Sequence, residues 1–185
     1  MLGMSDLRLG TVINYNGEPY QITWTQHIKM ARSGATLRTK MKNLISGAVL
    51  EKTFAGGDKV EEADLAHSSA NFLYQQQSDY FFMDNQTFEQ YQFSAQTLDA
   101  SAAYLMPGQT VDVMLFNGRA VAVALPKKIA LTVTQAPPGI KGDTSGSATK
   151  SATLETGLEI KVPLFIKEGE KVIVNTETGD YVERA

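Results

Sequence analysis

The residues best suited to chemistry in this sequence are regularly spaced cations. Arg38, Lys40 and Lys42 occupy every second position of one segment. Because side chains alternate between the two faces of a β-strand, this spacing predicts that all three cations share one face. Such a row can bind a polyanion such as RNA, with counterion release supplying the affinity. The alternative is a strand face that is solvated by water and has no partner.

The segment before this row is typical of the tip of a long hairpin. It contains Lys29 and Arg32, and the small residues Ser33 and Gly34 would let a partner's backbone approach closely. Positions 19–50 contain no Asp or Glu, although the whole chain has 20 acidic against 17 basic residues and a net charge of −3. We therefore predict a local RNA-binding surface, made of Lys29, Arg32, Ser33, Gly34, Arg38, Lys40 and Lys42.

A second candidate is a loop rich in small polar residues. It reads Gly142, Asp143, Thr144, Ser145 and Gly146. Backbone N–H groups in such a loop can bind phosphates or base edges. The Gly-Lys-Ser/Thr of a nucleotide-binding P-loop is absent from the sequence, and a flexible hairpin without a ligand is the alternative.

Signals for catalysis or metal binding are weak. The chain has no cysteine, which excludes disulfides, thiol nucleophiles and cysteine-ligated zinc. His27 and His67 are far apart in the sequence, with no acidic residue at ligand-like spacing. Ser147 and Lys150 match the Ser-x-x-Lys of penicillin-recognising enzymes, but the companion motifs are missing. We expect no catalytic residue, no metal and no cofactor.

The elements that position these residues are read from turn signals. Asn16-Gly17 and Asn117-Gly118 each lie between β-rich segments, and Asn-Gly favours the two-residue turn of a β-hairpin. Residues 88–98 have room for one or two helical turns, and helical periodicity is otherwise absent. The fold class we predict is all-β, built from small barrels.

The charge distribution divides the chain into three blocks. Residues 1–64 carry a net charge of +1, residues 65–127 a net charge of −3, and residues 128–185 a net charge of −1. We predict three domains with these boundaries. A domain of this size buries only about 60% of the surface that its unfolded chain exposes, so we expect the three domains to pack against one another.

The chain shows no sign of a membrane segment or a secretory signal. No apolar run approaches the ~20 residues of a membrane span, and the first residues lack a charged stretch followed by an apolar one. We expect a cytoplasmic protein that is monomeric, with translation starting at Met1 or Met4.

Residues 150–169 read KSATLETGLEIKVPLFIKEG, and shorter distinctive runs occur elsewhere between about Leu7 and Arg184. Through these segments the sequence resembles the bacterial elongation factor P family. The most specific match is residues 150–169, which resemble the C-terminal signature of that family. The other matching segments are residues 43–47 and 51–54 in the first domain, residues 80–84 at the start of the second, and residues 138–146 in the third-domain loop.

This resemblance implies a fold and a function. It implies three β-barrels in an L-shaped, tRNA-like arrangement, a KOW-type barrel followed by two OB-fold barrels. It implies a non-enzymatic factor that binds both ribosomal subunits and their rRNA between the P and E sites and relieves stalling at consecutive prolines by positioning the P-site peptidyl-tRNA. Gly142–Gly146 would lie near the small subunit and the E-site codon of the mRNA.

The hairpin tip departs from the family pattern. Many members have a Pro-Gly-Lys-Gly tip whose lysine is modified, whereas an ungapped count from Lys29 to Lys40 places Arg32 at this position. Another branch carries a rhamnosylated arginine, so Arg32 is expected to be either rhamnosylated or active unmodified. Residues 31–37 are also similar to the elongation factor P-like paralogue, although the Gly142–Gly146 loop weighs against it. A general OB-type RNA-binding protein is the remaining alternative.

Overall fold

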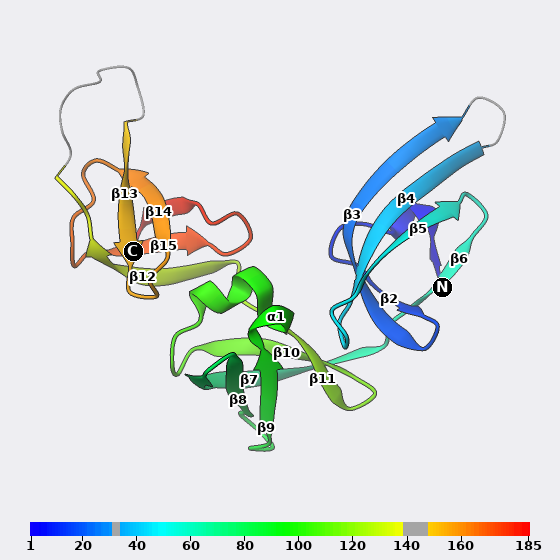
Figure 1. Ribbon diagram of the computed structural model, residues 1–185, viewed down its shortest axis with the longest axis horizontal. Coiled ribbons are helices and arrows are strands. Elements are labelled where there is room, and N and C mark those ends of the chain that lie inside the picture. The colour runs from blue at the N-terminus through cyan, green and yellow to red at the C-terminus, as the bar shows by residue number, and fades with distance from the viewer. Residues whose placement is uncertain (31–33, 139–147) are drawn as a thin grey trace.

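The computed structural model describes residues 1–30, 34–138 and 148–185. Within these ranges the chain forms three antiparallel sheets that follow one another along the sequence (Figure 1). Helix in the described ranges is limited to three short segments, η1 (Met4–Asp6), α1 (Ala95–Leu98) and η2 (Asp99–Tyr104). The predicted all-β class is confirmed. None of these helices has the length and apolar character needed to cross a membrane.

The first sheet has its strands in the order β1-β6-β2-β3-β4-β5. They are β1 (Leu2–Gly3), β2 (Val12–Tyr15), β3 (Glu18–Met30), β4 (Gly34–Asn43), β5 (Val49–Ala55) and β6 (Lys59–Glu62). Asn16 and Gly17 have φ values of 55° and 83°, as the predicted two-residue turn requires, and they join β2 to β3. β3 and β4 form a long hairpin, called the arm below, and β5 pairs with β4 from Thr36 to Lys42 (Figure 1).

The second sheet has the strand order β11-β10-β7-β8-β9. Its elements are β7 (Leu65–Gln76), β8 (Asp79–Asp84), β9 (Gln90–Ser94), β10 (Thr110–Phe116) and β11 (Arg119–Ala124), with α1 and η2 between β9 and β10. Asn117 and Gly118 again have positive φ values, 51° and 77°, and close the β10–β11 hairpin. Four buried aromatic residues dominate its core, namely Phe72, Tyr80, Phe82 and Phe93.

Asp84 is the buried acidic residue of this second sheet. Its carboxylate accepts hydrogen bonds from the backbone N–H groups of Gln86 and Thr87 at 2.8 and 2.9 Å, and from the hydroxyls of Ser68 and Tyr91. These donors, with the Ser68 hydroxyl contributing most, hold the pKa of Asp84 well below its ordinary value. The ionised carboxylate therefore fixes the turn between β8 and β9.

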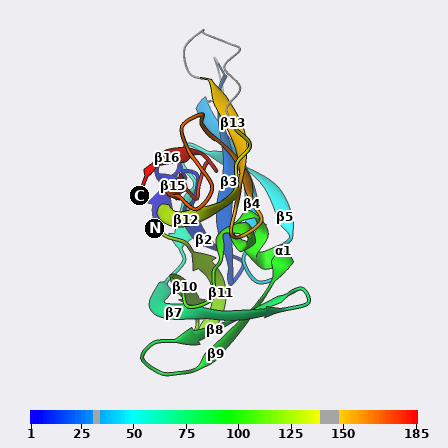
Figure 2. The same ribbon diagram turned by 90° about the vertical axis from the view of Figure 1, so that its left-hand side faces the viewer.

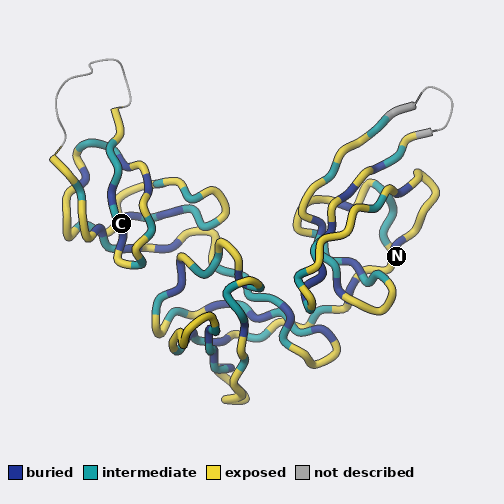
Figure 3. Tube along the Cα trace, in the orientation of Figure 1, coloured by how far each residue is buried: buried dark blue, intermediate teal, exposed yellow. Residues whose placement is uncertain are grey.

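The third sheet has the strand order β14-β13-β12-β15-β16. Its strands are β12 (Lys128–Gln135), β13 (Thr149–Leu154), β14 (Glu159–Pro163), β15 (Lys171–Asn175) and β16 (Tyr181–Arg184). Its core is aliphatic, with Val162, Ile166, Val172 and Val174 fully buried. The buried stretches of each of the three units gather inside that unit in Figure 3.

Apolar contacts join the middle unit to both of its neighbours. Toward the first unit, Phe116 and Val121 pack with Leu44 and Ala63 in a buried cluster, called the junction cluster below. Toward the third unit, Tyr104 of η2 enters the core formed by β12–β16. The first and third units both rise from the same side of the middle unit, which gives the molecule a bent outline (Figures 1 and 2).

Candidate nucleic-acid interface

The arm presents the predicted row of cations on its outer side. Leu37 and Met41 of β4 point into the core of the first unit and are fully buried. Arg38, Lys40 and Lys42 alternate with them along the same strand, which directs the three cations away from that core. Because Leu37, Thr39 and Met41 are buried, the residues that alternate with them face outward.

A single carboxylate on the neighbouring strand holds two of these cations. Glu51 of β5 pairs directly with Lys40 in the strand register. Its carboxylate lies 2.7 Å from the Arg38 guanidinium and 3.4 Å from the Lys40 ammonium. These contacts, led by the hydrogen bond from Arg38, lower the pKa of Glu51. The cluster of Arg38, Lys40 and Glu51 keeps one net positive charge. All three of these side chains are about half exposed, so a partner can reach them.

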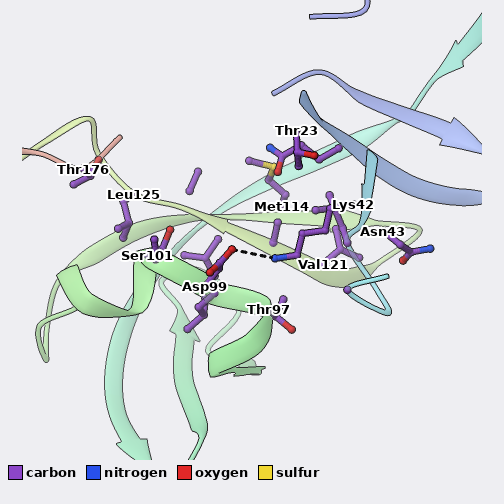
Figure 4. A pocket seen from close by; sticks show the side chains of 18 of the residues that line it. Thr23, Lys42, Asn43, Thr97, Asp99, Ser101, Met114, Val121, Leu125 and Thr176 are labelled. Atoms are coloured by element: carbon purple, nitrogen blue, oxygen red, sulfur yellow. Dashed lines mark ion pairs between the residues drawn. The ribbon is translucent and has the colours of Figure 1, made fainter. Parts of the chain in front are cut away.

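The structure separates Lys42 from the other two cations. Its side chain is only 20% exposed, and its Nζ lies 3.7 Å from the Asp99 carboxylate of η2 in the middle unit. Figure 4 shows this ion pair beside a cavity of about 410 Å³, whose lining includes Thr23, Val121 and Thr176 from the three units. Lys42 therefore joins the first and middle units, while Arg38 and Lys40 stay together on the outer face.

The remaining candidates of the hairpin lie toward its far end. Lys29 is on β3 and Gly34 is the first residue of β4, where the register pairs Met30 with Gly34. At ~3.3 Å per residue, Gly34 is roughly 20 Å along β4 from Lys40. Arg32 and Ser33 lie outside the described residues.

The predicted third-domain loop also lies outside the described residues. It comprises Gly142, Asp143, Thr144, Ser145 and Gly146. The chain enters this loop after β12 and leaves it before β13. Ser147 of the weak Ser-x-x-Lys match is likewise not described, and the Lys150 ammonium donates to the Pro137 carbonyl oxygen at 2.8 Å.

The described residues offer little to a metal or to acid–base chemistry. No group of three or more His, Cys, Asp or Glu side chains within them is placed to hold a metal ion. His67 lies with its Nδ1 2.6 Å from an Asp112 carboxylate oxygen, on the exposed face of neighbouring strands β7 and β10. His27 is exposed on β3. The outer face of the arm, with Arg38 and Lys40, instead provides positive charge and hydrogen-bond donors.

Three residues of this region were missed by the sequence reasoning. Glu51 and Asp99 meet Arg38 and Lys42 only through long-range strand pairing and packing between units. Trp24 of β3 stands beside Lys40, whose Nζ is 5.9 Å from the centre of the indole ring. The one sequence signal for Trp24 is that an aromatic residue occurs within the acid-free segment 19–50.

Comparison with known proteins assigns the family of this chain. Three family models match in succession: the elongation factor P KOW-like domain at residues 3–60, the elongation factor P OB domain at 65–123, and the elongation factor P C-terminal domain at 129–184. The elongation factor P of Oleidesulfovibrio alaskensis is 42% identical over 184 residues, which covers all of both chains. The chain belongs to the elongation factor P family.

A second sequence relative agrees with this membership. The elongation factor P of Moorella thermoacetica is 40% identical over 185 residues, again covering both chains completely. Among solved structures, the eukaryotic translation initiation factor 5A from Methanococcus jannaschii is similar with a TM-score of 0.48 and 19% identity, over 66% of this chain and 92% of that one.

Membership of the elongation factor P family makes this protein a translation elongation factor, and it implies association with the ribosome. The predicted family, its KOW-like first domain and its OB domain are confirmed. Ribosomes present a dense array of RNA phosphates, so the exposed cations Arg38 and Lys40 are suited to such a partner.

Proposed function

We propose that this elongation factor P family member relieves ribosomal stalling at consecutive prolines. In this proposal it binds as a monomer between the P and E sites in the cytoplasm, touches rRNA of both subunits, and positions the P-site peptidyl-tRNA for peptide bond formation. The observation that carries the proposal is the arm, a long hairpin with exposed cations along one side, on a chain that belongs to this family.

The chemistry of the proposal is orientation. Proline is a poor nucleophile with a constrained ring, so a misplaced peptidyl-tRNA end reacts slowly. A factor that holds this end in the reactive geometry accelerates the reaction without giving or taking a proton. Exposed cations and backbone donors on the arm are adequate for that task, because they bind phosphates and leave the reacting groups to the ribosome.

Arg32 is the residue we propose to act nearest the peptidyl-transferase centre. Its place in the sequence, between Met30 of β3 and Gly34 of β4, puts it in the connection at the end of the arm. A guanidinium stays protonated and is a weak nucleophile, so a lysine-modifying ligase would not act on it. Arg32 is therefore either rhamnosylated or active as an unmodified arginine.

The third unit is proposed to contact the small subunit and the E-site codon of the mRNA through Gly142–Gly146. The third unit follows the middle unit in the chain, and the first and third units rise from the same side of that middle unit (Figure 1). A factor of this outline can contact both subunits at once.

Translation of a Pro-Pro-Pro template in a reconstituted system tests the proposal. The reactions contain no factor, the protein purified from its native cells, the recombinant protein, or its Arg32→Ala variant. We expect the native protein to relieve stalling and Arg32→Ala to lose this effect. Failure of the native protein to relieve stalling would contradict the proposal and favour the paralogue.

Two further measurements separate the alternatives. A mass spectrum of the native peptide that contains Arg32 decides between the rhamnosylated and the unmodified form. Co-sedimentation with ribosomes, compared with binding to a free RNA oligonucleotide, separates a ribosome-dependent factor from a general OB-type RNA-binding protein.

A further inference from the structure

Trp24 is an exposed aromatic residue in the middle of the cationic arm. It is the single tryptophan of the chain, and 38% of it is accessible to solvent. Tryptophan is usually well buried in folded proteins, and exposed tryptophans are enriched at the residues that dominate binding interfaces. The exposure of Trp24 therefore indicates a binding surface at this point of the arm.

A β-bulge puts the Trp24 side chain on the outer face. The register pairs Ile22 with Met41 and Trp24 with Lys40, so that Thr23 is the additional residue. A shift of one residue moves a side chain to the opposite face of a strand. Without the bulge, alternation from the buried Ile22 would turn Trp24 into the core of the first unit. The Thr23 hydroxyl donates to the Lys40 carbonyl oxygen at 3.1 Å and stabilises the bulge.

The groups around the ring are those that bind a nucleotide. The Lys40 ammonium is 5.9 Å from the ring centre, within the range of a cation–π contact. Arg38 is two positions before Lys40 on β4, and Glu51 holds both cations in place. An aromatic face beside two cations matches an unpaired nucleotide, because the ring stacks on the base and the cations contact its phosphates.

We propose that Trp24 is a stacking residue for an unpaired RNA base, with Lys40 and Arg38 contacting the adjacent phosphates. This inference rests on the proposed function and adds a second contact to it. Trp24 is roughly 20 Å along β3 from Met30, so the stacked nucleotide anchors the middle of the arm, while Arg32 acts near the peptidyl-transferase centre. Incoming phosphates compete with Glu51 for the two cations that it holds in the free protein.

Affinity for ribosomes that carry a P-site tRNA tests the stacking. We expect Trp24→Leu to weaken binding by about tenfold, since base stacking is lost, and Trp24→Phe to retain most of the affinity. Tyr74→Leu is the matched control, because Tyr74 is an aromatic residue of the middle unit that is 46% accessible, somewhat more than Trp24. Unchanged thermal unfolding of all three variants shows that the fold is intact.

A cross-link identifies the class of partner. The photoreactive p-benzoylphenylalanine is incorporated in place of Trp24 and irradiated in the ribosome complex. A cross-link to RNA is expected. A cross-link to ribosomal protein alone, or parental affinity in Trp24→Leu, overturns the inference.

The stalling assay keeps the two proposals apart. If the native protein relieves stalling while Trp24→Leu binds as the parent does, the stacking role is wrong and the proposed function stands. If Trp24→Leu loses affinity and position 24 cross-links to RNA, but the native protein does not relieve stalling, the stacking role stands and the proposed function fails.

Discussion

The junction cluster couples the stability of the first unit to a residue of the middle unit. Phe116 belongs to β10, yet it packs with Leu44 and Ala63 of the first unit. Replacing a buried phenylalanine by alanine costs about 3–5 kcal/mol, and the lower end applies to a small cluster between units. With a urea dependence of about 1.5 kcal/mol per molar, Phe116→Ala should lower the unfolding midpoint by about 2 M.

Trp24 makes this prediction measurable for one unit alone. As the single tryptophan of the chain, it reports only on the first unit when its fluorescence is followed through a urea titration. Val162→Ala is the control, since Val162 is fully buried in the core of the third unit, away from the first. We expect Phe116→Ala to lower the midpoint reported by Trp24 and Val162→Ala to leave it unchanged.

Two results would refute this reasoning. A parental midpoint in Phe116→Ala would mean that the junction cluster contributes nothing to the first unit. An equal shift in both variants would mean that the whole chain unfolds as one body and that no specific coupling exists at the junction.

The remaining predictions concern single charges. Lys40→Gln should remove one phosphate contact, so that over a fourfold rise in salt the parent loses roughly threefold more ribosome affinity than the variant; equal losses in co-sedimentation would show that Lys40 touches no phosphate. The lowered pKa of Asp84 stabilises the fold at pH above its ordinary value of 3.8, and this stabilisation is lost as the pH falls below that value. Asp84→Asn should therefore be less stable than the parent at neutral pH, with a difference that shrinks in acid unfolding curves; a constant difference would exclude the linkage. A double-mutant cycle of Lys42→Met and Asp99→Asn should give a stabilising coupling of about 0.5 kcal/mol, which is small because Asp99 is exposed. A coupling within error of zero would mean that the pair does not help to join the units.

Local chemistry made much of the fold predictable. Asn-Gly at positions 16 and 117 requires two positive φ values, and both turns form as predicted. The alternation of cations with apolar residues on β4 follows from the same local rule. Residues 88–98 form one helical turn, α1, within the one or two for which the sequence has room; Gln90–Ser94 instead pair with β8 as β9.

The partners of the cations could not be predicted in the same way. The contact of Glu51 with Arg38 depends on the register between β4 and β5, and that of Lys42 with Asp99 on the packing of two units. The outward position of Trp24 depends on a bulge, which strict alternation along β3 does not anticipate.

The most direct test of the central claim is the rate of peptide bond formation between consecutive prolines on purified ribosomes, with and without the protein from its native cells. Because the proposed role is orientation, the ratio of the two rates should exceed one and stay constant between about pH 6.5 and 8. A ratio of one would contradict the function. A ratio that follows a titration curve would contradict the mechanism, since it would reveal a group that transfers a proton.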